Sequence, residues 1–279
     1  MLIPSSCGQS FFAMRLGLFL LLCSAVYCFS APDALDETAI LTELFQSTSG
    51  PNWGNSSGWS DSQHVCVNGL SNWYGVKCAG NYVQKLELSR NQLSGVIPAS
   101  LGQLSFLDHL DLSSNNLIAS IPSALCNLTS LETFLLNNNA LQGSIPDDIG
   151  ELEDLQYFDV SNNRISGSIP NSVGQFHNLV YFICNSNDLT GTVPSSLGNT
   201  GIEQFSCALN HLSGTLPSNL CPGGSVINCD LQYNPDIKCP SKSCNCYMPD
   251  CNCRDSCGSG VGCSGICDSC SSSSVGYCV

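Results

Sequence analysis

Basic residues are scarce in this chain. Its 279 residues include 8 Lys and Arg against 22 Asp and Glu, which gives a formal net charge of −14 at pH 7. Nucleic-acid binding depends on clustered Lys and Arg side chains that contact phosphates, and the basic residues here are scattered singly. The composition therefore predicts that nucleic acid is not a ligand. An acidic chain of this kind favours basic proteins or cations as partners.

Long apolar runs are also missing. Past the N-terminus, no stretch approaches the roughly 18 apolar residues of a membrane-spanning helix. The N-terminal stretch "MRLGLFLLLCSAVYCFS" has Arg15, an apolar run from Leu16 to about Cys28, and small residues suited to cleavage after Ser30. We interpret residues 1–30 as a signal peptide rather than a buried N-terminal helix. The mature protein is therefore expected to be secreted, without a transmembrane anchor.

Catalytic signatures are absent from the sequence. It contains no HExxH or GxSxG motif, no phosphate-binding loop and no dinucleotide fingerprint. The histidines His64, His109, His177 and His211 share no spacing that indicates a site. We therefore expect a protein that is not an enzyme and that uses no cofactor and no metal.

Cysteine is abundant. Removal of residues 1–30 leaves 17 of the 20 cysteines, a density that indicates disulfides in a secreted chain. Because 17 is odd, at least one thiol stays free or pairs with another chain. Residues 240–279 hold nine Cys and ten Ser but no Leu or Phe, so this tail depends on crosslinks. Its Cys-x-Cys and Cys-x-x-Cys spacings can hold zinc or copper, although secretion favours a disulfide-crosslinked stalk or module, and intermolecular disulfides are a further alternative.

An asparagine recurs every 23 or 24 residues. Three and five residues before it comes a pair of apolar residues or cysteines, and in all repeats but the last, Leu or Ile follows two residues after it and Pro seven after it. Such a period indicates stacked repeats, because one coil alone cannot bury its apolar side chains. The asparagines are Asn91, Asn115, Asn139, Asn163, Asn187, Asn210 and Asn234.

Each part of the repeat has a physical role. Alternation of Leu-x-Leu places two side chains on one face of a strand. A buried Asn amide can satisfy backbone groups where the strand ends, and we expect it to do so on its own coil and on the next. Pro suits an extended segment without a ladder donor, and the Gly four residues after Asn relieves a tight bend. Ala119 departs from this Gly pattern.

The stretch "LELSRNQLSGVIPASLGQL" (Leu86–Leu104) is similar to the plant-type extracellular leucine-rich repeat, LxxLxLxxNxLxGxIPxxLGxL. The resemblance covers residues 34–239. It implies an α/β fold, a right-handed solenoid of about seven coils with a parallel concave sheet. A second short strand is implied at the Gly-x-Ile-Pro segments.

The ends of the solenoid need caps. The segment "DALDETAILTELFQSTSG" spaces its apolar residues at helical intervals, with Asp33 as N-cap. The segment "CVNGLSNWYGVKC" resembles the N-terminal capping region of the family, which implies a Cys66–Cys78 disulfide. We divide the chain into a signal peptide (1–30), an N-terminal capping region (31–82), repeats with a C-terminal cap (83–239) and a Cys/Ser-rich tail (240–279).

The best candidate site is the outward row of side chains on the predicted sheet. Residues four and six before each Asn alternate with the core leucines and point to solvent. Neighbouring members of one row lie about 4.8 Å apart, so the third to fifth coils should present an exposed apolar and aromatic patch beside an aspartate. Such patches suit protein recognition, although β-propensity alone can also place Tyr and Ile on a sheet. The candidate partner-binding residues are Lys85, Glu87, His109, Asp111, Leu135, Tyr157, Asp159, Tyr181, Ile183 and Asp230.

The repeats contain further cysteines, and the chain has two glycosylation sequons. We interpret Cys184, Cys207 and Cys229 as small buried thiols, because they occupy core positions. Packing also explains Cys126 and Cys221, although Cys221 could pair with Cys239. Two glycosylation sequons are present, at Asn55 and Asn127, and Asn55 is the favoured acceptor because it lies in a loop between tryptophans.

Two functions from different classes fit these observations. The first is a secreted module that recognises a protein or peptide through the concave sheet, since the resemblance extends to plant receptor-like ectodomains and polygalacturonase inhibitors. It implies recognition, defence or inhibition, and the acidic face predicts a basic partner. The second is a structural component of an extracellular matrix or cell wall, crosslinked through the Cys-rich tail.

Overall fold

The computed structural model describes residues 37–59, 64–220, 228–238 and 246–247. All of them belong to one compact unit. The predicted signal peptide, the Asp33 cap and the Cys221–Cys239 alternative lie outside the described residues. So does the tail, apart from the backbone of residues 246–247.

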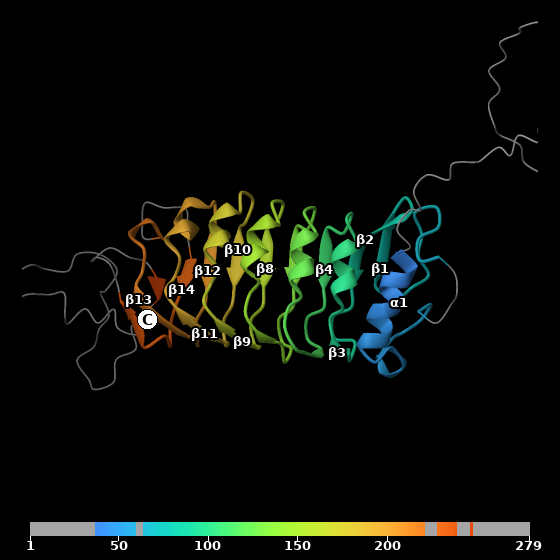
Figure 1. Cartoon of the computed structure of the whole chain (residues 1–279), viewed down its shortest axis with the longest axis horizontal. Coiled ribbons are helices and arrows are strands. Elements are labelled where there is room, and N and C mark those ends of the chain that lie inside the picture. Colours follow the sequence, from blue (N-terminus) through green and yellow to red (C-terminus); the bar gives the residue numbers. More distant parts are fainter. Residues whose placement is uncertain (1–36, 60–63, 221–227, 239–245, 248–279) are drawn as a thin grey trace, which may run out of the picture. The chain divides into compact units, whose positions relative to one another are not determined.

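The described coils stack side by side, and each contributes one strand to a long sheet (Figure 1). Within the described residues this sheet has nine strands in the order β1-β2-β4-β6-β8-β10-β12-β14-β16. All pairs are parallel except β1 with β2, which closes the N-terminal end as a hairpin. The strands are β1 (Val76–Ala79), β2 (Tyr82–Glu87), β4 (His109–Asp111), β6 (Thr133–Leu135), β8 (Tyr157–Asp159), β10 (Tyr181–Ile183), β12 (Gln204–Ser206), β14 (Asn228–Asp230) and β16 (Cys246–Tyr247).

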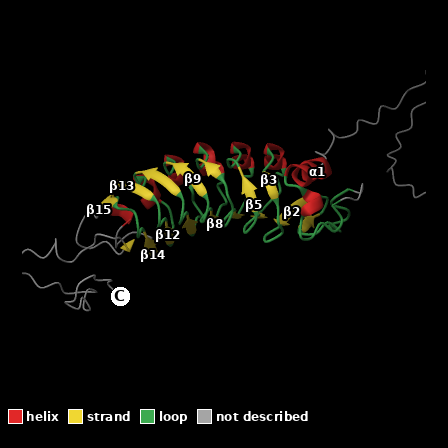
Figure 2. Cartoon of the chain, turned by 90° about the horizontal axis from the view of Figure 1, so that it is seen from below, coloured by secondary structure: helices red, strands yellow, loops and turns green. Residues whose placement is uncertain are grey.

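A second set of short strands follows each asparagine, as the resemblance implied. Figure 2 shows the coils along an arc, with these strands and the helices on its outer side and the long sheet on its inner side. The solenoid fold with its parallel sheet is therefore confirmed. The second strands are β3 (Ser94–Val96), β5 (Asn116–Ile118), β7 (Gln142–Gly143), β9 (Arg164–Gly167), β11 (Asp188–Gly191), β13 (His211–Thr215) and β15 (Asp236–Lys238).

Single turns of 3-10 helix return the chain to the next strand. Each of those from η2 to η6 has its Pro at the N-cap in an extended conformation, for example Pro122 at φ −63° and ψ 129°. Their bounds are η1 (Gly50–Asn52), η2 (Ala99–Gln103), η3 (Ser123–Asn127), η4 (Asp147–Glu151), η5 (Asn171–Gln175), η6 (Ser195–Asn199) and η7 (Ser218–Leu220).

The repeated asparagines bind the coils together, as predicted. The Nδ2 group of Asn115 donates to the carbonyl oxygens of Leu112, on its own coil, and Leu88, on the preceding coil, both at 2.9 Å. Its Oδ1 accepts from the backbone N–H groups of Asn91 and Leu93 at 3.0 Å. The Asn115 amide therefore links its own coil to the preceding coil, because the side chain points back against the chain direction. The prediction of a link to the next coil is wrong.

A row of phenylalanines in contact fills the middle of the core. Phe134, Phe158, Phe182 and Phe205 are fully buried, and successive ring centroids lie 5.7, 5.1 and 5.9 Å apart. Each contributes roughly 1.5–3 kcal/mol through burial. Because these residues are the middle residues of β6, β8, β10 and β12, they fix the neighbouring residues of the same strands on the opposite face.

The exception to the Gly pattern coincides with a break in the second layer of strands. Gly143 and Gly167, at the equivalent place in later coils, have φ of 80° and 77°, and Ala119 adopts the same left-handed region at 66°. Within the described residues the second strands form a pair, β3-β5, and a separate group of five from β7 to β15. Ala119 lies directly between the two groups.

A helix and a tryptophan cluster close the N-terminal end. Helix α1 (Glu37–Ser47) buries Ile40, Leu41 and Leu44. Trp53, Trp59 and Trp73 pack beneath it, and the Cys66–Cys78 disulfide that the resemblance implied is present, with Cα atoms 5.8 Å apart.

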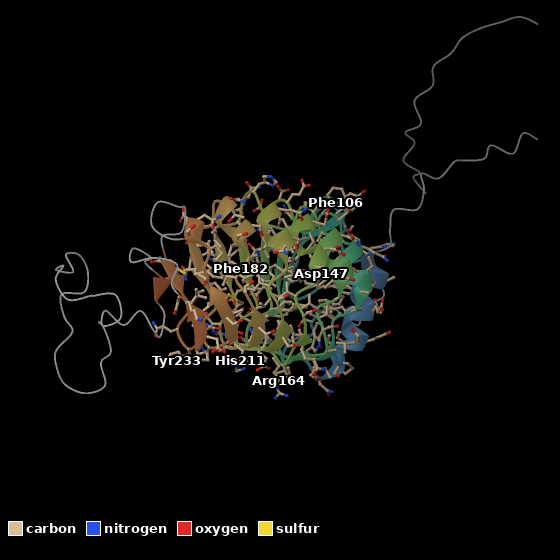
Figure 3. All side chains as sticks on the ribbon, turned by 60° about the vertical axis from the view of Figure 1, so that its left-hand side comes forward. Phe106, Asp147, Arg164, Phe182, His211 and Tyr233 are labelled. Carbon is tan, nitrogen blue, oxygen red and sulfur yellow. A yellow bond between two sulfur atoms is a disulfide. The ribbon has the colours of Figure 1, made fainter. Side chains whose placement is uncertain are left out.

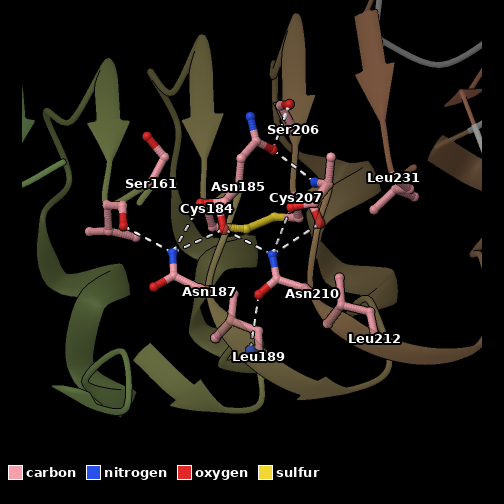
Figure 4. The surroundings of a disulfide bond; sticks show 12 residues. Ser161, Cys184, Asn185, Asn187, Leu189, Ser206, Cys207, Asn210, Leu212 and Leu231 are labelled. Atoms are coloured by element: carbon pink, nitrogen blue, oxygen red, sulfur yellow. Dashed lines mark hydrogen bonds between the residues drawn. A yellow bond between two sulfur atoms is a disulfide. The ribbon is translucent and has the colours of Figure 1, made fainter. Parts of the chain in front are cut away.

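The interpretation of Cys184, Cys207 and Cys229 as thiols is wrong. Cys184 and Cys207 form a disulfide between neighbouring coils, with Cα atoms 4.6 Å apart (Figure 4), and Cys229 is also disulfide-bonded. Parallel strands bring the same repeat position of adjacent coils within bonding reach, so core cysteines in register can crosslink. Cys126 is the free cysteine of the described residues. Its burial, together with Asp148 and Glu151, raises the pKa of its thiol to about 12.

Candidate recognition face

The candidate face is the inner surface of the long sheet. In β4, β6, β8 and β10 the middle residue is buried, while the first and third residues are partly exposed. Each strand therefore presents two side chains on the side opposite the core.

The register places these side chains in two continuous rows. The predicted residues of neighbouring coils are paired directly, so the structure brings them together on one surface. The first row reads Lys85, His109, Thr133, Tyr157, Tyr181, Gln204 and Asn228. The second reads Glu87, Asp111, Leu135, Asp159, Ile183, Ser206 and Asp230.

Two stacked tyrosines form the centre of the face. The ring centroids of Tyr157 and Tyr181 lie 4.6 Å apart, with an interplanar angle of 27°. Leu135 and Ile183 flank Asp159 in the neighbouring row. These side chains are half-buried, so the patch is less exposed than predicted. Neighbouring strands lie about 4.8 Å apart, so each large side chain is partly covered by the next one in its row, which explains the difference.

The three aspartates of the face share one local arrangement. The Oδ1 atoms of Asp111, Asp159 and Asp230 each accept from the backbone N–H two residues later, at 2.9, 2.8 and 3.1 Å. Burial raises the pKa of Asp159, which the hydrogen bonds from Ser161 partly offset. Burial and the nearby Asp159 raise the pKa of Tyr157.

The basic residues of this sheet lie at its N-terminal end. Lys77 on β1 pairs with Glu87 at 2.8 Å, and Lys85 on β2 approaches Asp108 at 3.7 Å. Asp108 was not among the predicted residues, although it lies directly before His109 and thus beside the predicted row. The Lys85 contact is a weak one, because both side chains are partly exposed and 3.7 Å apart.

Sequence reasoning also missed a second stacked aromatic pair. Tyr82 and Phe106 are 38% and 51% exposed, with ring centroids 4.2 Å apart. They are 24 residues apart, nine before consecutive repeat asparagines, so the period itself was the signal that could have identified them. They lie outside the two rows of the face.

Hollows in the surface lie elsewhere. One of about 550 Å³ is lined by small residues around η3, and one of about 350 Å³ by residues of the capping region such as His64 and Leu70. No candidate residue lines either of them. The described residues hold no cluster of potential metal ligands, and none of their helices has the length and apolar character to cross a membrane.

The two sequons differ in exposure. Asn127 is exposed at the end of η3. Asn55 is partly buried, and its Oδ1 accepts from the backbone N–H and the hydroxyl of Ser57 at 3.1 and 2.8 Å. Glycosylation of both, with Asn55 favoured, stays a prediction.

Known proteins share this architecture. Models of the leucine-rich repeat match residues 81–141 and 154–176, whereas comparison with curated proteins gives no match. One chain of the BIR3–SERK2 complex from Arabidopsis thaliana is 35% identical with a TM-score of 0.55, and the match covers 64% of this chain and 96% of that one.

Two further solved structures agree. The BIR2 ectodomain from Arabidopsis thaliana is 32% identical with a TM-score of 0.52, over 75% of this chain and 98% of that one. A chain from the complex of the Arabidopsis receptor kinase HAESA with the peptide hormone IDA and the co-receptor SERK1 is 27% identical with a TM-score of 0.61. That match covers 74% of this chain but only 38% of that one. On its repeats, its sheet and these similarities, the chain belongs to the plant-type extracellular leucine-rich repeat family.

Proposed function

We propose that this chain is a secreted, non-enzymatic module that recognises a protein or peptide through the inner face of its long sheet. The observation that carries the proposal is the Tyr157–Tyr181 stack beside Leu135, Ile183 and Asp159. Tyrosine combines a large contact area with a polar tip and few rotatable bonds, which is why it is frequent at protein interfaces.

The similar proteins support the class of ligand. The BIR3–SERK2 structure is a complex between two proteins, and HAESA was solved with a peptide hormone and a co-receptor. We extend protein or peptide recognition to this chain on that basis, with roles in recognition, defence or inhibition.

The sequence and the disulfides support secretion. Two disulfides are defined within the described residues, and disulfides persist in oxidising compartments. The apolar N-terminal segment fits export.

A pull-down from extracellular fluid tests the proposal. The double variant Tyr157→Ala/Tyr181→Ala should recover at least about tenfold less partner than wild type, because truncation of central aromatic anchors costs 1 kcal/mol or more each. Tyr82→Ala/Phe106→Ala removes an equally stacked exposed pair outside the rows and should recover partner normally. Equal recovery by wild type and the Tyr157/Tyr181 variant would contradict the proposal.

A matrix role is the second candidate, favoured by the nine cysteines in residues 240–279. Non-reducing gels separate the two functions. High-mass species that collapse on reduction indicate crosslinking into a matrix, whereas a clean monomer favours the binding module.

A further inference from the structure

Charge is unevenly distributed over the long sheet. Its strands from β6 to β14 carry Asp159 and Asp230 but no Lys, Arg or His. Glu132 and Glu203 directly precede β6 and β12. All charged residues of these five strands are therefore acidic.

The other described basic residues lie outside this sheet. Arg164 belongs to β9 and Lys238 to β15, both among the second strands, and Arg90 lies in a loop. Figure 3 shows Arg164 projecting outward, away from the body of the coils. Within the described residues, no ion pair includes Asp159.

The aspartate and the tyrosines are close enough to contact one group together. Asp159 and Tyr157 are two residues apart on the same side of β8, about 6.6 Å along the strand. Burial raises the pKa of Tyr157, and the nearby Asp159 carboxylate raises it further. Tyr181 extends the aromatic surface onto the next strand.

We propose that the face binds an arginine side chain of an extended partner segment, with the guanidinium against the Tyr157–Tyr181 stack and its N–H groups paired with the Asp159 carboxylate. This inference rests on the proposed function and specifies the chemistry of its partner. Guanidinium is planar, stacks on aromatic rings and pairs with a carboxylate through two parallel hydrogen bonds. Leu135 and Ile183 on either side of Asp159 limit water access to this pair.

The geometry favours arginine over other groups. A lysine ammonium is compact and strongly hydrated, so it gains less from a flat, half-buried aromatic surface. An acidic segment would meet Asp159 with like charge. A purely apolar segment would cover the half-buried Asp159 carboxylate without supplying a positive charge, which is unfavourable.

Selection from a random octapeptide library tests the inference. Binders that depend on Tyr157 and Tyr181 should be enriched in arginine. Replacement of that arginine by citrulline, which keeps the shape and removes the charge, should weaken binding of the synthetic peptide to wild type about tenfold. The same replacement should change binding to Asp159→Asn by less than about threefold, because the charge partner is already missing.

Asp111→Asn is the matched control. Asp111 occupies the same strand position two coils earlier and accepts the same kind of backbone hydrogen bond, but it lies beside His109 rather than a tyrosine. Its substitution should preserve the tenfold effect of citrulline. Equal effects of citrulline on Asp159→Asn and wild type would overturn the arginine pairing.

The outcomes separate the two proposals. Peptides that need the tyrosine pair but carry no arginine overturn the inference and leave the proposed function standing. Peptides indifferent to the tyrosine pair, or a library without binders, count against both.

Discussion

Ala119 is the residue at which the repeat departs from its own pattern. Its φ of 66° lies in the left-handed region, where a side chain with Cβ costs roughly 1–2 kcal/mol relative to glycine. The equivalent residues of neighbouring coils, Gly95 and Gly143, avoid this cost. Ala119, a non-glycine residue with left-handed backbone, therefore lies where the second layer of strands is interrupted.

Ala119→Gly should therefore stabilise the protein. We expect the free energy of unfolding to rise by about 0.5–1 kcal/mol, since relief of the left-handed strain exceeds the added chain entropy of glycine. Urea unfolding monitored by circular dichroism measures this change.

The reciprocal substitution Gly143→Ala is the control. It should destabilise the protein by a similar or larger amount, because a Cβ there would approach the Cβ of Ser120 to 3.0 Å. If Ala119→Gly lowers stability, the left-handed backbone at Ala119 is not strained as described.

At the scale of elements, a buried carboxylate joins helix α1 to the sheet. Glu37 is 6% exposed, and its carboxylate accepts the backbone N–H of Val83 on β2 at 2.6 Å. Burial raises the pKa of Glu37 above its ordinary value of 4.5, against the lowering effect of this hydrogen bond. The folded state therefore binds the proton more tightly than the unfolded state.

Glu37 should make stability fall as pH rises. The pKa of Glu37 is higher in the folded state than in the unfolded state, so folding takes up a proton between pH 4.5 and the raised pKa. Protonated Glu37 stabilises the folded state, and this contribution is lost as pH rises across that interval. Glu37→Gln keeps an acceptor for Val83 and removes the titration. The difference in unfolding free energy between wild type and this variant should thus change with pH above 4.5.

The same measurement on the exposed variant Glu153→Gln controls for the general effect of replacing a carboxylate by an amide. A flat difference for Glu37→Gln would show that this carboxylate has no raised pKa in the folded protein.

Much of the element order could be predicted because the repeat constrains it. One buried asparagine, one proline and three leucine-type positions per coil define the strand, the turn and the return segment together. The direction of the asparagine bridge could not be predicted, since both neighbouring coils offer backbone groups. The disulfide of Cys184 with Cys207 was missed because packing alone accounts for cysteine at core positions, and only the parallel register shows their proximity.

The position of the candidate face on the sheet could also be predicted from the sequence. Two-residue alternation placed Tyr157 and Tyr181 on the outward side, and the 24-residue period placed them on adjacent strands. Their mutual coverage depends on side-chain orientation, which the pattern does not specify. The Tyr82–Phe106 stack was not predicted, because its residues precede the strand positions that form the two rows.

At the scale of the whole molecule, covalent links hold both ends of the described array. The Cys66–Cys78 bond lies in the N-terminal cap, and the Cys184–Cys207 bond spans two coils near the C-terminal end. A solenoid is stabilised mainly by contacts between neighbouring repeats, so its terminal coils are the first to open. The second disulfide counters this opening.

Cys184→Ala/Cys207→Ala should lower the unfolding free energy by about 2–4 kcal/mol, the usual contribution of a disulfide that closes a loop of this size. Cys126→Ala removes a buried free thiol without breaking a crosslink and should cost less. Urea unfolding under non-reducing conditions compares the two. A loss for the double variant no larger than for Cys126→Ala would show that the crosslink does not stabilise the array.

Oxidative side-chain footprinting of the chain with its recovered partner tests the recognition face most directly. We predict that Tyr157 and Tyr181 lose reactivity in the complex, while Tyr82 and Phe106 keep theirs. Protection of Tyr82 and Phe106 with unchanged Tyr157 and Tyr181 would contradict the account.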